Sequence, residues 1–545
     1  DNMEVISLYN GQKSAIFQPA KDYSSASAIY MQTRKPLFKG EKKNNLNIGV
    51  KGGSFSTINP SLLWEHRFNE RISSSISTEY MYTSGRYKFT YAKKDGYDTT
   101  AVRQNGDVRM LRLENAFFGK VPKGEWKAKA YLYNSERGYP GAAVREEPGK
   151  FRHQDRQWDT NLFVQGSFQN YFKPWYSLLA NGKYAYDYLH YLSDPRLDVT
   201  TMYVDNHYRQ QEIYASAAHL FTIYPWWSMS LSNDFQWNAL RADLIDFVYP
   251  TRNTILTSAA TSFDFNRLML QASLLYTHVD DNTRTKGANA GTKNKYTPSV
   301  IATWQPLTKL PLNVRAFYKK VFRMPTLNDL YYTFIGNKDL KPEYTTQYDV
   351  GITFSHTWNN HWLKSLDLQI DGYYNEVDDK IIAMPTSNQF RWTMINLGHV
   401  EIRGLDAAIR GEWGFGKVEL STLFNYTYQK AQDFTDPTSE WYGGQIPYIP
   451  WHGGSIILNG SYQTWSCNYS FIYTGERYEA VANIPENYAQ PWYTHDFSLS
   501  KTFQWGKTGI RVTAEINNIF NQQYEVVQCY PMPGTSFKIK LNVML

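Results

Sequence analysis

Long apolar runs, cysteines and charge blocks are all scarce in this sequence of 545 residues. No segment approaches the roughly 18 continuous apolar residues that suggest a membrane-spanning helix. The two cysteines, Cys467 and Cys529, do not indicate a disulfide framework or a metal site. The net charge of +7 is spread along the chain, with no basic block sharper than Lys39–Lys43, which argues against a nucleic-acid partner.

Alternation of apolar and polar residues is what the sequence has instead. In residues 418–428, Val418 and Leu420 share one face of an extended strand, and Glu419 and Ser421 share the other. The same pattern recurs along the chain. In a soluble sandwich the polar face would be the outside, whereas in an outer-membrane barrel the apolar face lies against lipid.

The connections between these strands alternate strictly between short and long, as in a barrel with short periplasmic turns and long extracellular loops. Residues near 69, 121 and 506 are therefore expected in the periplasm, and those near 95, 285 and 435 outside. Counting predicts an all-β, antiparallel transmembrane barrel of roughly 22 strands. The long connections lie near 84–106, 137–155, 190–207, 280–296, 322–343, 376–392, 429–448 and 475–491.

Aromatic residues are abundant, at 16% of the chain with 43 Tyr and 17 Trp. They cluster where strands meet short turns, at 171–176, 224–227 and 462–465, which is typical of an interfacial girdle. No linker interrupts the series, so residues 45–545 are expected to form one barrel domain.

Residues 1–44 do not fit the strand pattern. The runs at 3–17 and 24–36 resemble the last segment of the plug domain of TonB-dependent outer-membrane receptors, although Gln12, Gln18 and Ser25/Ser27 replace that family's usual proline and glycines. The resemblance continues, in the family's order, through residues 322–331 with 340–343, 396–406, 449–452, 517–521 with Tyr524, and 533–545.

The resemblance implies a 22-stranded barrel filled by an N-terminal plug, of which 1–44 would be the C-terminal part. A barrel this wide is not filled by its own side chains, and 44 residues are too few to close it. We therefore expect most of the plug and the TonB box to be absent from this chain. No signal peptide is present, which predicts a mature or shortened chain.

The implied function is active uptake of a scarce large ligand across the outer membrane, without covalent chemistry. The TonB–ExbB–ExbD complex would remodel the plug using the proton-motive force, and a surface lipoprotein could act as a lid. The sequences of residues 13–21 and of the short loop 55–60 most resemble those of cobalamin receptors of Bacteroidota. Aromatic loop residues are the predicted ligand-binding positions: Tyr186, Tyr188, Tyr191, Trp441 and Tyr442.

Ferric siderophore and haem remain alternative ligands. A haem receptor would be expected to carry a histidine between Arg323 and Glu343, and the sequence has none there. A siderophore would favour clustered arginines, and those of the loop near 137–156 are interspersed with acidic residues. No cofactor is expected apart from a possible structural calcium, for which one long connection supplies hard oxygen ligands: Asp187, Asp194, Asp198 and Asp205.

Two interpretations from other classes also remain. A passive porin-like channel would fit the missing plug. An outer-membrane enzyme would need a Ser/His or Asp/His constellation, and the adjacent pair His495-Asp496 points to opposite faces of its strand. The sequence therefore predicts a non-enzymatic protein of the outer membrane.

Overall fold

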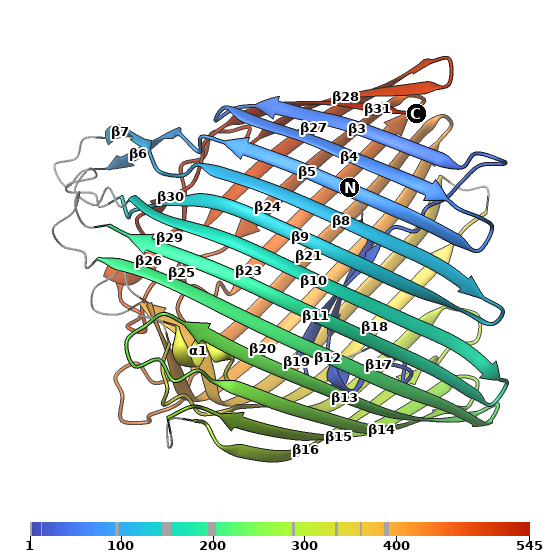
Figure 1. Ribbon diagram of the computed structural model, residues 1–545, viewed down its shortest axis with the longest axis horizontal. Helices are drawn as coiled ribbons and strands as arrows, with labels where there is room; N and C mark the ends of the chain where they lie inside the picture. Colours follow the sequence, from blue (N-terminus) through green and yellow to red (C-terminus); the bar gives the residue numbers. More distant parts are fainter. Residues whose placement is uncertain are drawn as a thin grey trace.

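The computed structural model describes residues 3–11, 13–92, 98–143, 154–194, 203–285, 289–332, 336–359, 362–385 and 392–545. Its strands form a closed antiparallel barrel of 22 wall positions, in which β3 pairs with β31 to complete the ring (Figure 1). Two labelled strands, β22 and β23, share one position because both pair with β21.

The wall strands follow one another around the ring in chain order. They are β3 (Asn44–Gly53), β4 (Thr57–Arg67), β5 (Ile72–Thr83), β8 (Val108–Val121), β9 (Gly124–Pro140), β10 (Gln154–Lys173), β11 (Tyr176–Ser193), β12 (Val204–Tyr224), β13 (Trp227–Ala242), β14 (Thr251–Asp264), β15 (Leu268–Asn282), β16 (Thr292–Trp304), β17 (Leu312–Arg323), β18 (Glu343–Thr357), β19 (Leu363–Pro385), β20 (Trp392–Phe415), β21 (Val418–Asp433), β22 (Gly444–Gln445), β23 (His452–Tyr462), β24 (Trp465–Thr474), β27 (Trp492–Trp505), β28 (Thr508–Asn517) and β31 (Ser536–Met544).

The predicted strand number and barrel architecture are confirmed. The long connections lie at one end of the barrel, on the left of Figure 1, and short turns lie at the other. The turn between β3 and β4 is an exception, because it has only three residues but lies at the long-loop end, where Ser84 donates its backbone N–H to the Phe55 carbonyl. The predicted loop near 376–392 differs, because β19 continues to Pro385 and β20 begins at Trp392. These two strands have 23 and 24 residues, so they extend further than the other wall strands.

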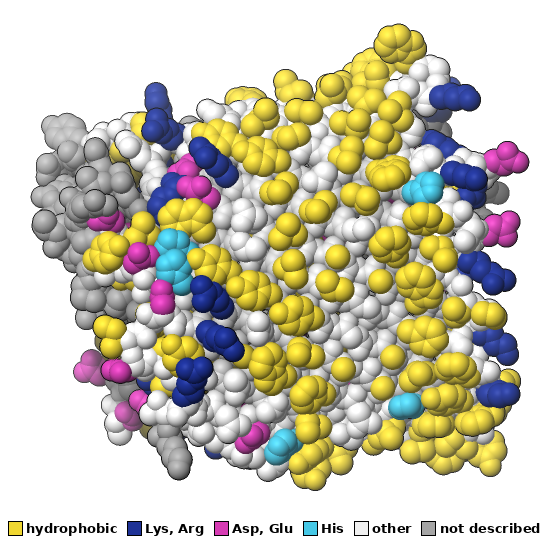
Figure 2. Space-filling model, viewed as in Figure 1, with side chains coloured by type: hydrophobic (Ala, Val, Ile, Leu, Met, Phe, Trp, Pro, Cys, Tyr) yellow, Lys and Arg dark blue, Asp and Glu magenta, His cyan; other side chains and the backbone are white. Residues whose placement is uncertain are grey.

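The wall has an apolar outer face and a polar inner face. In β13, Ser232 and Asp234 are buried toward the lumen, while Met229, Leu231 and Phe235 face outward with 40–43% of their surface exposed. Figure 2 shows hydrophobic side chains spread across the middle of the outer wall. Alternate residues therefore meet lipid and lumen, as the period-two pattern predicts.

Outward aromatic residues cluster at the short turns. Trp226 stacks with Tyr224 at 5.5 Å and lies 5.9 Å from Phe265 of the next turn. Further along, Trp362 stacks on Trp413 at 5.2 Å. These rings form a girdle at the periplasmic edge of the apolar belt, where amphipathic aromatics are favoured.

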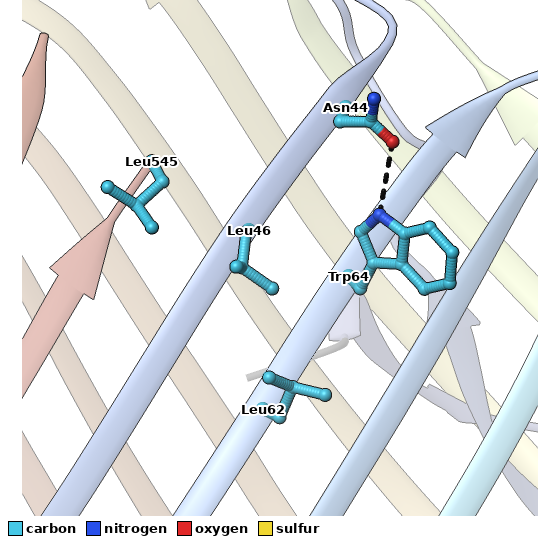
Figure 3. Close-up of a pocket in the computed structure, with 5 residues that line it drawn as sticks. All are labelled: Asn44, Leu46, Leu62, Trp64 and Leu545. Carbon is cyan, nitrogen blue, oxygen red and sulfur yellow. Dashed lines mark hydrogen bonds between the residues drawn. The ribbon is translucent and has the colours of Figure 1, made fainter.

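The chain ends at the seam of the barrel. Leu545 and Leu46 exchange backbone hydrogen bonds of 2.8 and 3.1 Å. Beside them Trp64 donates its indole N–H to Asn44 Oδ1 at 3.1 Å. Figure 3 shows the side chains of Leu46, Leu62 and Trp64 around the shallow apolar pocket at this seam.

Elements outside the wall are short. No helix among the described residues is long and apolar enough to cross a membrane. These elements are β1 (Met3–Asn10), η1 (Ala20–Tyr23), β2 (Ser27–Thr33), β6 (Tyr87–Ala92), β7 (Asp98–Arg103), α1 (Leu327–Tyr331), β25 (Arg477–Tyr478), η3 (Pro485–Asn487), β26 (Tyr488–Ala489), β29 (Glu525–Val527) and β30 (Tyr530–Pro531).

Candidate functional site: the barrel lumen and its extracellular mouth

The N-terminal segment, residues 3–36, lies inside the barrel and is hydrogen-bonded to lumen-facing side chains of several strands. Asp234 of β13 accepts the backbone N–H groups of Ala20 (3.0 Å) and Lys21 (2.8 Å) at the start of η1. Gln271 of β15 donates to the Ser14 carbonyl at 2.7 Å. These contacts satisfy backbone groups that would otherwise be buried without partners.

Lys319 of β17 holds both ends of this segment's central loop. Its side chain is 1% exposed, and its Nζ donates to the carbonyls of Gly11 (3.1 Å) and Ser25 (2.8 Å). Gly11 has a φ of +84°, and a Cβ there would lie 2.6 Å from the ring of Phe317. Only glycine therefore fits this turn without displacing the ring.

Apolar packing supports the same docking. Ile16, Ala20 and Tyr23 are buried against Leu256 and Leu275, with Ala260 in the same cluster. Burial raises the pKa of the Tyr23 hydroxyl, so this phenol stays neutral; it donates to the Ile16 carbonyl at 3.0 Å. Nearer the short turns, Arg34 pairs with Glu65 and Lys35 with Glu125.

The β1–β2 hairpin has an apolar face that the described residues do not cover. Ile6 pairs with Met31 and Leu8 with Ile29 across the two strands, and all four side chains are 64–66% exposed. The hairpin is thus anchored at its turn end, where residues 11–25 contact the wall, and is open on one face.

The extracellular mouth is narrowed from within by the connection 323–343. Its helix α1 begins with a reciprocal capping box between Thr326 and Asp329, in which each side chain accepts from the other's backbone N–H. Leu327 and Leu330 of α1 are buried against Tyr208 and Leu240 of the wall. The part of this connection that contains α1 therefore folds down into the barrel instead of projecting away from it.

Arg252 of β14 fixes this connection in place. Its guanidinium makes two hydrogen bonds to Asp281 of β15, at 2.6 and 2.7 Å, and a third to the Pro325 carbonyl at 2.6 Å. Arg252 and Asp281 are 7% and 3% exposed. Burial of the ion pair is compatible with stability because the carboxylate is met by a bidentate partner.

A buried arginine joins two of the described outer loops. Arg477 of β25 is 3% exposed and donates to the carbonyls of Gln490, Glu525 and Val526 at 2.9–3.1 Å. Tyr87 of β6 donates its hydroxyl to the Pro531 carbonyl at 2.6 Å. Described loop residues from distant parts of the chain are thus connected at this part of the rim.

The predicted ligand-binding aromatics fall on two different sides of the wall. Tyr186 and Tyr188 lie opposite Gln211 and Arg209 of β12, on the outward-facing register positions. Tyr191 faces inward, and its hydroxyl donates to Asp155 at 2.5 Å. The other two, Trp441 and Tyr442, lie in the loop after β21, 36% and 47% exposed.

The predicted calcium ligands are not brought together in the described part of the chain. Asp187 is on the inner face of β11 and accepts from Asn161 at 2.6 Å, whereas Asp205 is on the outer face of β12. Asp194 follows the end of β11, and Asp198 lies outside the described residues. Because Asp187 and Asp205 lie on opposite faces of the wall, they are not placed to share one ion.

Asp205 has two histidine neighbours instead. His190 Nε2 lies 2.7 Å and His207 Nε2 3.6 Å from its Oδ1, so the three side chains form a candidate metal cluster. The two imidazoles are stacked at 4.0 Å with an interplanar angle of 11°. The nitrogen lone pairs of stacked rings lie in two nearly parallel planes, so one ion could lie in the plane of both imidazoles only after a ring rotates.

Lys319, Asp234 and Arg252 were not recognised from the sequence. Each is a charged residue on the polar, lumen-facing side of its strand. The sequence carries no further signal of which backbone groups it meets, because those contacts join positions 73 to 308 residues apart.

Comparison with known proteins decides the family. The sequence profile described as "TonB dependent receptor-like, beta-barrel" matches residues 43–519, which is most of the chain. The chain belongs to this family of outer-membrane receptors. The predicted family and outer-membrane location are thereby confirmed.

Two similar curated proteins are vitamin B12 transporters named BtuB. The protein of Photobacterium profundum is 28% identical over 244 residues, covering 43% of this chain and 36% of the relative. The protein of Vibrio vulnificus (strain YJ016) is 31% identical over 207 residues, covering 37% and 29%. The chain thus matches only about a third of the length of these relatives.

Solved structures share the fold over the whole chain. The FrpB iron transporter from Neisseria meningitidis (F3-3 variant) has a TM-score of 0.76 at 12% identity, with 100% of this chain and 88% of that chain covered. The copper transporter OprC gives 0.73 at 14% identity, covering 99% and 85%. Identities this low support the fold alone.

Proposed function

We propose that this chain forms the barrel of a TonB-dependent transporter that imports cobalamin across the outer membrane. The choice of cobalamin as the ligand rests on the similarity to two proteins named vitamin B12 transporters. The family match supports TonB-dependent transport as the general activity. Tyr191, Trp441 and Tyr442 are the proposed ligand contacts, since Tyr186 and Tyr188 face away from the lumen.

In this mechanism residues 3–36 are the closing part of the plug. The ligand first binds at the rim formed by the outer loops and α1. TonB, energised with ExbB and ExbD, then loosens the plug from the wall. Part of the docking consists of hydrogen bonds to polar lumen side chains, which water can replace as the segment moves. The polar lumen that remains then suits passage of a hydrated ligand.

A ferric siderophore or another iron source is the second candidate. FrpB and the siderophore receptor PiuA from Acinetobacter baumannii, with TM-scores of 0.76 and 0.75, are named for iron or siderophores. A Haemophilus influenzae protein, named as a probable hemoglobin-binding protein, is 26% identical over 157 residues. These similarities favour the same transport class with a different ligand.

Competition binding distinguishes these ligands. Cells that express the complete gene and cells that lack it would be incubated with radiolabelled cobalamin. Unlabelled cobalamin and ferric siderophores would serve as competitors. We expect submicromolar, gene-dependent binding that unlabelled cobalamin displaces and ferric siderophores do not. Absence of gene-dependent cobalamin binding would contradict the proposed ligand, and TonB-independent ion conductance in planar bilayers would favour a passive channel.

Replacing the exposed loop aromatics should weaken ligand binding. In the Trp441→Ala/Tyr442→Ala variant we expect about a tenfold loss of cobalamin affinity, because two ring contacts are removed. Tyr186→Ala, on the outer face of the wall, should leave the affinity unchanged. Equal affinities of all three proteins, measured on whole cells at matched surface levels, would contradict the assignment of these loop residues.

A further inference from the structure

Three arginines share the outer face of the wall at its extracellular margin. Arg209 of β12 and Arg241 of β13 are directly opposite each other in the strand register. Arg284, just beyond β15, lines the same groove of about 580 Å³. The other lining residues are Tyr188, His207, Ala242, Asp243 and Tyr249.

This arrangement is unfavourable without an anion. Like charges directly opposite on one face of an antiparallel pair repel each other. Within the described residues none of the three guanidinium groups forms a salt bridge, although the chain contains many such pairs elsewhere. The one acidic residue of the groove, Asp243, instead accepts the His207 backbone N–H at 2.8 Å and has its other oxygen 3.8 Å from His207 Nε2.

Aromatic rings line the groove beside these cations. The Arg284 guanidinium lies 4.2 Å from the ring centroid of Tyr249, and that of Arg209 lies 6.0 Å from Tyr188. Such contacts hold a guanidinium while leaving its N–H groups free to bind planar anionic groups. The groove therefore combines positive charge with guanidinium N–H groups that meet no acceptor in the part of the chain that the structure describes.

Its height on the wall indicates the kind of anion. On the same outer face, nearer the middle of the wall, lie Ile213, Phe235 and Ile255. These side chains are 42–44% exposed and belong to the apolar belt. Figure 2 shows Lys and Arg side chains gathered at the margin of this belt nearest the long loops. The groove thus lies where the charged headgroups of the outer leaflet meet the acyl chains.

We propose that this groove binds the phosphate groups of a lipid of the outer leaflet. The outward position separates it from the lumen, so it is independent of the transported ligand. Arginine recognises phosphate through charge-assisted, paired hydrogen bonds. The negative charge of a bound phosphate would offset the repulsion between Arg209 and Arg241. A bound lipid would fix the barrel at a defined depth and rotation in the membrane.

The test compares two triple variants with the same change in net charge. The groove variant carries Arg209→Gln, Arg241→Gln and Arg284→Gln; the control carries Lys309→Gln, Lys417→Gln and Lys507→Gln, all exposed at the opposite end. Binding of diphosphoryl lipid A to each purified barrel in detergent micelles is measured by native mass spectrometry. We expect affinity to fall on the order of 100-fold in the groove variant and to be unchanged in the control.

Two further arms identify what is bound. First, dephosphorylated lipid A should bind the wild-type barrel no better than it binds the groove variant. Second, millimolar inorganic phosphate should not displace diphosphoryl lipid A from the wild-type barrel. Equal lipid binding by wild type and groove variant overturns the proposal. Displacement by inorganic phosphate overturns the lipid as the source and leaves a phosphate site. If the triple variant does not fold, lipid A binding is measured for the single variant Arg241→Gln, and binding equal to that of the wild type again overturns the proposal.

Discussion

Replacing Lys319 by Met is expected to release the N-terminal segment from the barrel wall. The substitution removes the only charged donor to the Gly11 and Ser25 carbonyls among the described residues and keeps a flexible side chain of similar length. Hydrogen bonds to charged groups contribute about 1.5–3 kcal/mol each, so we expect a loss of about 3 kcal/mol in docking free energy. Local opening of residues 11–25 should increase roughly a hundredfold.

Hydrogen exchange of the purified barrel measures this opening. The amides of Gly11, Ala20 and Lys21 should exchange faster in Lys319→Met, since they bond within the segment or to Asp234. Lys320→Met is the matched control, because the next residue of β17 faces outward and does not contact the segment among its described neighbours. Unchanged protection in Lys319→Met, or equal acceleration in both variants, would contradict the anchoring role.

A second variant tests the same docking without altering charge. Gly11→Ala places a methyl group 2.6 Å from the Phe317 ring at a backbone φ of +84°. We expect it to loosen the segment as Lys319→Met does, because both the conformation and the ring contact oppose the added Cβ. Wild-type exchange rates in Gly11→Ala would indicate that the turn adapts and that this close approach is not needed for docking.

The wall could be predicted from the sequence because each strand meets two different environments. Lipid outside and polar lumen inside impose opposite residue types on alternate positions, as Leu231 and Ser232 of β13 show. Above the membrane this contrast disappears. Val377 and Ile381 of β19 are buried toward the inside against mouth residues, so the pattern there no longer resembles a membrane strand and favours a loop instead.

The site was predictable only in part, because its contacts depend on three-dimensional registration. The predicted ligand-binding aromatics lie near strand ends at the long-loop end of the barrel, but which face each side chain takes depends on a strand register that the sequence leaves ambiguous near a loop. Tyr188 and Tyr191, three residues apart, lie on opposite faces of β11. The two carbonyls that Lys319 binds belong to residues 308 and 294 positions away, and no local pattern encodes them.

Removing Arg252 is expected to have the largest effect on the barrel itself. In Arg252→Met the carboxylate of Asp281 stays buried at 3% exposure without its bidentate partner. Breaking a buried ion pair from one side costs about 3–5 kcal/mol. Thermal unfolding followed by circular dichroism in detergent should therefore shift to a clearly lower temperature. Arg267→Met, at an exposed short turn, is the control and should unfold like the wild type.

The double variant Arg252→Met/Asp281→Leu separates the two roles of this arginine. Replacing both charges by apolar side chains removes the stranded carboxylate, so the unfolding temperature should return close to that of the wild type. The contact from Arg252 to the Pro325 carbonyl stays absent, however, so the connection 323–343 should remain loosened. Trypsin should then cleave after Lys338 in both variants and spare the wild type. Recovery of both unfolding temperature and protease resistance would show that α1 is held by its apolar contacts with Tyr208 and Leu240 alone.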